Sequence, residues 1–472
     1  MRTWWPLVAV CLGTFLFLLD TTVLTVALPD IGGDLSASLS GLQWVANIYT
    51  LVLAVLMLTM GALTDRYGAR TVYIAGLAVF GLASLGCGLA PTTGVLIAAR
   101  GLQGVGGAAM SVTTFALIGS VYRGPDMGRA MGVFGAVTGL GAAAGPMAGG
   151  VLTQWLSWRA AFFVNVPLVL LTLALTTRLP APERRPAPER RAAVARLDVP
   201  GTAAFALCAG SLTYALTTAG EADRSPAVVA VWAALAALGL AAFVRAERRC
   251  PVPLLDIRLF TRAAFSAVMM CVVASTAAFA ALVYTSVWLQ SGLGLGPVRA
   301  GLALMPLALA SFATSLLSGR ALHGRSPRAV LGTGLLLSGV GCALQSGLDA
   351  GSSAGSVTLG LAVTGVGVGL MGPAMGAAVF AALPPERGGM AAGAMTTFRQ
   401  LGQTLGVAVF GVLFRQGATP AQGLDRVLMA AAAAGIAGAV LAYVFVPTAA
   451  SKSGATEGRS RRDQDRTTDV AP

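Results

Sequence analysis

Long apolar runs, separated by short charged or turn-forming segments, repeat along the whole chain. A helix that crosses a bilayer requires about 20 mainly apolar residues, and fourteen runs approach or exceed that length. The pattern predicts an all-α polytopic membrane protein with both termini on one side. The predicted spans lie at about 5–28, 43–63, 72–90, 94–120, 129–152, 160–177, 199–219, 227–244, 263–287, 300–318, 328–347, 356–382, 390–414 and 427–446.

The composition supports this prediction and excludes several kinds of chemistry. Only 11% of the 472 residues are charged, whereas a soluble protein carries about a quarter. The six cysteines show neither CxxC nor metal-ligand spacing, so we expect no disulfide, no metal and no cofactor. The chain has no GxxxxGK[ST] loop for ATP, and its one histidine, His323, lies in a charged loop. We do not expect an enzyme.

The net charge of +13 would indicate nucleic-acid binding in a soluble protein, so the positions of the charges matter. If the amino terminus is cytoplasmic, 25 basic residues lie in cytoplasmic segments and five in external loops. This asymmetry follows the positive-inside rule. It predicts a multi-pass protein of the cell membrane with both termini in the cytoplasm and no nucleic-acid partner, and contact with anionic lipids as a by-product.

Three ionisable residues lie well inside predicted spans: Asp20, Arg100 and Arg399. A charge at bilayer depth is costly and indicates a functional role or a partner. Asp20 and Arg100 both fall in the outer half of the bilayer, which favours a pair, either functional or purely structural. Arg399 shares a polar helix with Gln403, where lining of a cavity and interhelical hydrogen bonding are both open.

Two further segments are distinctive. In GLGAAAGPMAGG, Gly141, Gly145 and Gly149 recur every four residues and open a flat helix face, while Pro146 is expected to bend the helix. Between the second and third spans, GALTDRYGAR places an acid among arginines. We interpret this ten-residue turn either as a latch between helices or as an ordinary charged loop.

These motifs, in order along the chain, resemble the fourteen-helix drug:proton antiporters of the major facilitator superfamily. The similar segments run from residue 19 to about residue 414. They are LDTTVLTVALP, GALTDRYGAR, IAARGLQGVGGA, GLGAAAGPMAGG, WRAAFFVNVP, PVPLLDIRLF and PPERGGMAAGAMTTFRQLGQTLGVAV. Two departures stand out: Thr25 replaces the usual asparagine of the first helix, and SGRALHGRSPR lacks the acid of the turn at residues 61–70.

The resemblance implies a major facilitator fold with 14 transmembrane helices, two six-helix halves plus two extra helices. The expected divisions are an N-terminal half 1–177, a cytoplasmic linker 178–198, two extra helices 199–244, a cytoplasmic linker 245–262, a C-terminal half 263–446 and a disordered cytoplasmic tail 447–472. The proline-rich repeat in 178–198 and the polar composition of 447–472 favour unfolded segments.

The resemblance also implies proton-coupled export of amphipathic drugs or antibiotics by alternating access, with protons and the small-molecule substrate as partners of a monomer in the lipid bilayer. We expect Asp20 to carry the proton and Arg100 to promote its release, supported by Thr22, Gln103 and Gly104. The cytoplasmic latch would comprise Gly61, Asp65, Arg66, Gly68, Arg70 and Arg129, and the antiporter motif Gly141, Gly145, Pro146, Gly149 and Gly150.

Substrate contacts are a further hypothesis, because aromatic residues in spans also serve packing and interfacial anchoring. The candidates are Trp44, Asn47, Tyr49, Phe279, Tyr284, Trp288, Gln290, Arg399 and Gln403. The alternative functions are proton-coupled symport for uptake of a small metabolite and a receptor or lipid scaffold without transport. The antiporter motif argues against symport, and a scaffold gives no reason for Asp20 and Arg100 to share a depth.

Overall fold

The computed structural model describes residues 4–122, 125–178, 198–219, 225–250, 257–321, 325–349, 351–382 and 388–447. Within these ranges every regular element is a helix. Most of the predicted linker 178–198 and nearly all of the predicted tail 447–472 lie outside the described residues. The sequence-predicted ranges all coincide with helices, several of which extend beyond the predicted ends.

The N-terminal half contains seven helices: α1 (Trp5–Asp34), α2 (Leu39–Tyr67), α3 (Ala69–Gly88), α4 (Thr93–Val121), α5 (Pro125–Trp155), α6 (Ala160–Phe163) and α7 (Asn165–Thr177). The extra pair is α9 (Val199–Thr218) and α10 (Pro226–Arg249). Hydroxyl side chains begin several helices by accepting a backbone N–H, as Ser38 does for α2 and Thr92 for α4. Such caps stabilise a helix by about 1 kcal/mol.

The C-terminal half follows with η1 (Ile257–Thr261), α11 (Ala263–Ser275), α12 (Ala277–Val287), η2 (Trp288–Gly292), α13 (Pro297–Ala321), α14 (Pro327–Leu344), η3 (Ala354–Val357), α15 (Thr358–Ala382), α16 (Gly388–Arg415) and α17 (Pro420–Phe445). Twelve spans among the described residues are long and apolar enough to cross a membrane. The helices α5 and α16, of 31 and 28 residues, lie beside them in the bundle.

Two predicted boundaries are wrong. The expected ten-residue turn at residues 61–70 is almost entirely helical, since α2 ends at Tyr67 and α3 begins at Ala69. Gly68 alone joins the two helices, with a φ of 86° that side chains rarely adopt. The expected linker 245–262 begins too early, because α10 continues through Arg249. Charged residues in the sequence indicate the depth of the membrane surface, and helices extend past that depth into water.

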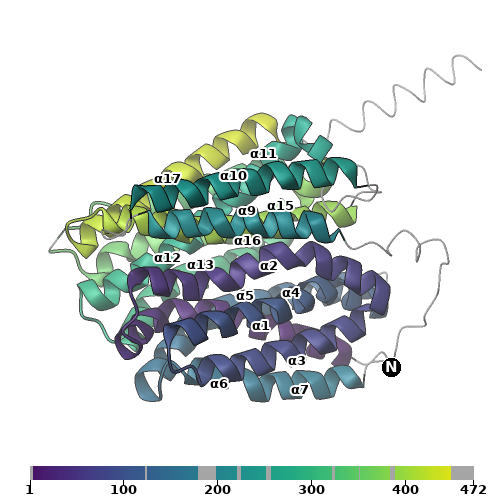
Figure 1. Cartoon of the computed structure of the whole chain (residues 1–472), viewed down its shortest axis with the longest axis horizontal. Helices are drawn as coiled ribbons and strands as arrows, with labels where there is room; N and C mark the ends of the chain where they lie inside the picture. Colours follow the sequence, from purple (N-terminus) through teal and green to yellow (C-terminus); the bar gives the residue numbers. More distant parts are fainter. Residues whose placement is uncertain are drawn as a thin grey trace, which may run out of the picture.

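The two halves form stacked bundles, with the N-terminal half in purple and blue and the C-terminal half in green and yellow (Figure 1). The extra helix α9 packs against α2 of one half and α16 of the other. One hydroxyl pair links α9 to α2, Thr202 to Thr59 at 3.1 Å. The extra pair therefore bridges the two halves.

Apolar packing divides the molecule into a shared end and a separate end. One core cluster joins residues of both halves, including Ile31 and Leu42 with Tyr284 and Leu289. At the opposite end each half has its own cluster, and the C-terminal cluster includes Phe243 of α10. The halves are thus packed together where α1 ends and α2 begins.

Close helix packing predicts which glycines are needed for stability. A β-carbon added at Gly106 of α4 would lie 2.6 Å from the Gly76 carbonyl oxygen and the Phe80 nitrogen of α3. Gly106→Ala should therefore lower the free energy of unfolding by about 1–3 kcal/mol. The measurement is thermal unfolding of the purified protein. Gly94→Ala is the matched control, because an added β-carbon there meets nothing within 4 Å; equal melting temperatures for the two variants would contradict the packing argument.

Candidate functional site

A buried ion pair lies at the centre of the N-terminal half. Asp20 of α1 is 4% exposed and Arg100 of α4 is 1% exposed. The guanidinium Nη1 of Arg100 donates to Oδ2 of Asp20 at 2.5 Å. The two residues that the sequence places at similar depth are thus in direct contact.

Two amides complete the shell around the carboxylate. Gln103, one helical turn after Arg100, donates from Nε2 to Oδ1 of Asp20 at 2.8 Å. Asn165, the first residue of α7, donates to the same oxygen at 2.9 Å. The carboxylate therefore accepts three hydrogen bonds from N–H donors.

Arg100 is held on its other sides as well. Its Nε donates to the Val45 carbonyl oxygen at 3.3 Å, and its Nη1 donates to Oε1 of Gln103 at 2.6 Å. The Tyr49 ring centroid lies 4.3 Å from the guanidinium carbon and that of Phe162 lies 5.8 Å away. These contacts offset part of the cost of burying the cation.

The buried contact is an ion pair with no net charge. Taking ions out of water costs several kcal/mol each unless partners compensate. Each of the two charges therefore depends on the other for its burial.

The glycines of α5 pack against α1 of the same half and against α13 of the other half. An added β-carbon at Gly145 would collide with the Thr22 side chain of α1, and one at Gly149 would lie 2.7 Å from the Val23 carbonyl oxygen. On the other side, a β-carbon added at Gly150 would lie 2.7 Å from the carbonyl oxygen of Pro297 in α13. Thr22 thus packs on α5, and its hydroxyl donates to Leu18 of its own helix.

The remaining glycines of the predicted sets have less uniform surroundings. A β-carbon on Gly104 would lie 2.9 Å from the Tyr49 carbonyl oxygen of α2, and one on Gly141 would lie 3.2 Å from the β-carbon of Leu18. At Gly61 the nearest atom, from Val112, would be 3.9 Å away. Pro146 is contained within the continuous helix α5, and its carbonyl oxygen would lie 2.5 Å from a β-carbon on Gly301 of α13. Helix α5 therefore packs closely against both α1 and α13.

The predicted latch residues have separate partners in this conformation. Arg70 donates to the Thr177 carbonyl oxygen at the end of α7. Arg66 lies over the ring of Tyr67 at 5.2 Å, and Arg129 forms an exposed ion pair with Asp126 at 3.7 Å. The side chain of Asp65 falls outside the described part of the chain. Among the described side chains, these arginines do not converge.

Polar contacts join the halves along α2 and α16. Gln43 donates to the Tyr284 hydroxyl at 2.7 Å, and Arg415 donates to Oε1 of Gln43 at 3.0 Å. Nearer the middle of the bundle, the hydroxyls of Thr50 and Thr404 lie 2.7 Å apart. Every hydrogen bond between the two halves in the described ranges lies on the shared end or near mid-bundle.

Several predicted substrate residues lie at these contacts between the halves or in packed cores. Gln290 of η2 donates to the Val26 carbonyl oxygen at 2.9 Å, and Trp288 is 1% exposed. Tyr284 is fully buried and donates to the Val407 carbonyl oxygen. Trp44 packs its ring 6.1 Å from that of Tyr214 in α9. In this conformation Gln290, Trp288 and Tyr284 close the shared end of the two halves. Trp44 packs against the extra pair.

Tyr49, Asn47, Phe279, Gln403 and Arg399 differ in exposure. Tyr49 is fully buried against Arg100, and Asn47 is fully buried with no hydrogen bond on either side-chain polar atom. Phe279 and Gln403 are half-buried. Arg399 is exposed although it lies near the middle of α16. It is one turn from Gln403 on the same helix face.

Asn165 and Gln43 are the functional-site residues that sequence reasoning did not single out. Asn165 occurs in the segment WRAAFFVNVP, where a lone amide interrupts an apolar run. Gln43 precedes an aromatic residue at the start of α2. An amide within an apolar segment was a usable signal, but its partner on another helix requires the tertiary structure.

The two stacked helical halves and the buried ion pair are features of a multi-pass membrane carrier. Comparisons with known proteins identify the family to which the chain belongs. A profile described as Major Facilitator Superfamily matches residues 10–407 and, a second time, residues 268–468. The chain therefore belongs to the major facilitator superfamily, a family of membrane transporters.

Characterised relatives are similar over most of the chain. Puromycin resistance protein pur8 of Streptomyces alboniger is 36% identical over 90% of this chain and 84% of its own. Multidrug resistance protein Stp of Mycobacterium tuberculosis is 35% identical over 86% of this chain and 74% of its own. The crystal structure of a D-xylose-proton symporter superposes with a TM-score of 0.68 at 14% identity, covering 95% of this chain and 98% of the symporter. That structural likeness shows the fold alone.

The donor from Asn165 predicts a contribution to stability. Asn165→Leu removes an N–H donor to the buried Asp20 carboxylate. A hydrogen bond to a charged group contributes about 1.5–3 kcal/mol, so the free energy of unfolding should fall by about that amount. Thermal unfolding of the purified protein measures this. Thr172→Val on the same helix is the control, because the Thr172 hydroxyl donates only to the Leu168 carbonyl; equal melting temperatures for Asn165→Leu and the wild type would refute the role.

Proposed function

We propose that this protein is a proton-coupled antiporter that exports amphipathic drugs or antibiotics across the cytoplasmic membrane by alternating access. The observation that carries the proposal is the buried contact of Asp20 with Arg100, 2.5 Å between heavy atoms. The proposal is supported by relatives named as resistance and export proteins. Those names favour export over uptake by symport.

The proposed topology has 14 spans, obtained when α5 and α16 are added to the twelve other candidates. The arginine-rich loops support a cytoplasmic location for both termini. In that orientation the shared end of the two halves is external, and the structure corresponds to a state closed to the outside. A monomer suffices, because one chain supplies both halves.

Asp20 is the proposed proton carrier. In the outward-open state it takes a proton. In the inward-facing state the positive charge of Arg100 and the amides of Gln103 and Asn165 favour proton release to the cytoplasm. Each proton supplies about 2.3 kcal/mol per 100 mV and about 1.36 kcal/mol per pH unit.

The antiporter motif is proposed to seal the external side. Gly145 and Gly149 let α5 pack on α1, while Gly150 lets it approach α13 of the other half. Side chains as large as alanine would hold these helices apart. The seal prevents proton leak while the substrate site faces inward.

The cytoplasmic latch is proposed for the opposite state. Asp65, Arg66 and Arg70, helped by Arg129, would hold the cytoplasmic ends together when the protein opens outward. In the present conformation the three arginines have other partners, which fits a released latch. Gly68 would permit the tight α2–α3 corner that positions them.

Substrate is proposed to enter between the halves from the cytoplasmic side. Arg399 and Gln403 share a face of α16, and Phe279 on α12 supplies an aromatic surface. Asn47 offers an unsatisfied amide above the Thr50–Thr404 contact. A mixture of apolar, amide and cationic groups suits amphipathic compounds.

The proton-carrier role predicts the effect of one substitution. Asp20→Asn keeps the side-chain shape but removes the exchangeable charge, so proton-driven efflux in everted vesicles should be abolished while expression is retained. The control is Asp349→Asn, because Asp349 lies in an exposed loop and bonds only to Ser352 and Gly351. Full pH-driven efflux in Asp20→Asn would overturn the assignment, and pH-driven uptake by the wild type would favour symport.

The seal predicts an uncoupling variant. Gly145→Ala forces α1 and α5 apart at a cost of about 1–3 kcal/mol, so efflux per proton translocated should fall and proton leak should rise. Simultaneous measurement of proton flux and drug flux in proteoliposomes tests this. Gly210→Ala in α9 is the control, because an added β-carbon there meets nothing within 4 Å; tight coupling in well-folded Gly145→Ala would contradict the seal.

A further inference from the structure

Helix α10 has the least buried surface of the twelve candidate spans. Only 11% of its apolar window is buried inside the protein, whereas the other windows are at least 28% buried. Its buried side contains Ala236, Gly239 and Phe243, which face α9 and the C-terminal core. The remaining surface of α10 therefore contacts lipid.

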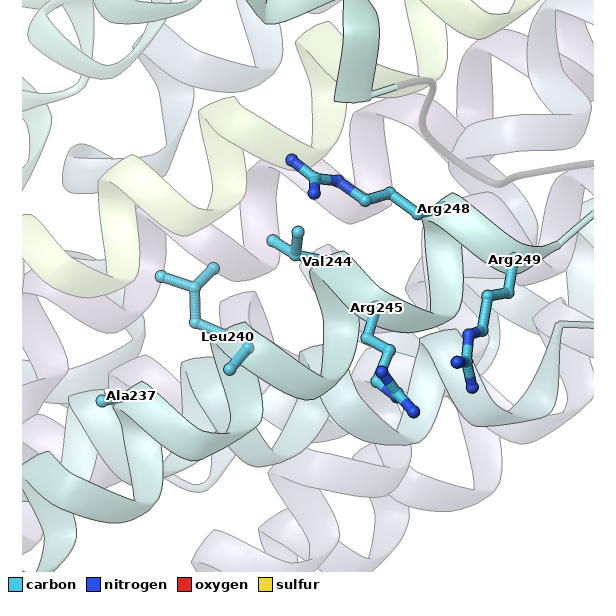
Figure 2. A pocket seen from close by; sticks show the side chains of 7 residues that line it. Ala237, Leu240, Val244, Arg245, Arg248 and Arg249 are labelled. Carbon is cyan, nitrogen blue, oxygen red and sulfur yellow. The ribbon is translucent and has the colours of Figure 1, made fainter.

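A pocket lies along this lipid-facing side. It has a volume of roughly 530 Å³, and its lining residues in the described part of the chain all belong to α10 (Figure 2). Ala237, Leu240, Ala241 and Val244 form its apolar part. The pocket ends at three arginines of the last helical turns, Arg245, Arg248 and Arg249.

The arginines hold their charges around the end of the pocket. Arg245 and Arg249, one turn apart, extend to one side of α10, while Arg248 extends to the other (Figure 2). All three are exposed, and none forms a hydrogen bond or ion pair with another residue of the described ranges. The acid of this turn, Glu247, is 4% exposed and lies on the buried side.

We infer that this pocket binds one anionic phospholipid. The acyl chain lies along the apolar part, and the guanidinium groups of Arg245, Arg248 and Arg249 bind the phosphate and the anionic headgroup. Arginine pairs with phosphate through charge-assisted hydrogen bonds. Clusters of arginine at the end of a span are suited to anionic headgroups.

The dimensions of the pocket distinguish a lipid from a soluble anion. From Ala237 to Arg249 a helix rises by about 18 Å, and one leaflet of the hydrocarbon core is about 15 Å thick. The apolar part, from Ala237 to Val244, thus rises by about 10.5 Å, which covers most of one leaflet, and the arginines lie at the depth of its headgroups. A soluble phosphate would use the arginines alone and leave the apolar part without a ligand.

The site lies on the pair of helices that bridges the two halves. Helix α10 packs on α9, and α9 contacts α2 and α16. The inference concerns lipid binding and stands independently of the transport direction proposed above.

The test uses the full-length purified protein and native mass spectrometry with added phosphatidylglycerol or phosphatidylcholine. Wild type should retain phosphatidylglycerol preferentially. With about 1 kcal/mol from each arginine, the triple variant Arg245→Gln, Arg248→Gln, Arg249→Gln should weaken this binding by on the order of a hundredfold. The variant Ala241→Trp, which fills the apolar part and keeps the charge, should also reduce it.

Matched controls separate a built site from general surface charge. The variant Arg178→Gln, Arg325→Gln, Arg328→Gln removes the same charge outside the pocket and should leave binding unchanged. Equal retention of both lipids, or equal losses in the two triple variants, would overturn the inference. Unchanged binding in Ala241→Trp, or full displacement by inorganic phosphate, would indicate a phosphate site and would also overturn it. Melting temperatures of all variants establish that each remains folded.

Discussion

The burial of opposite charges at the centre of the N-terminal half is the constraint on which the rest of the structure depends. Asp20 and Arg100 lie where neither would be stable alone. Gln103 and Asn165 therefore supply hydrogen bonds from two further positions, and Tyr49 covers the guanidinium. Helices α1, α2, α4 and α7 must keep their mutual positions to satisfy these groups.

The contacts between the two halves are of two kinds, hydrogen bonds between polar side chains and close packing of backbone. Polar side chains such as Gln43 and Thr50 meet α16 and α12 directly. Between α5 and α13 the contact is close backbone packing, because Gly150 of α5 carries no side chain. Flat surfaces of this kind slide or separate without trapping side chains. The combination suits a protein whose halves rock about a central site.

The ends of the helices follow less directly from the sequence than the presence of the helices. The charged segment at residues 61–70 was expected to be a turn, yet only Gly68 lies between two helices. Trp44 and Tyr49 are predicted substrate contacts, and in this conformation they pack against Tyr214 and Arg100. An aromatic residue in a span is compatible with core, lipid or cavity, and only the neighbouring helices decide among these.

The sequence by itself determined the helical class, the spans, the family resemblance and the small set of buried charges, because hydrophobic periodicity and the cost of charge in lipid act locally along the chain. The tertiary structure decided which groups meet. It placed Asn165 beside Asp20 across 145 positions of sequence, packed α5 between α1 and α13, and left Arg399 exposed near mid-helix. These outcomes depend on the rotation and spacing of whole helices, which follow from packing summed over many side chains and are absent from any single segment.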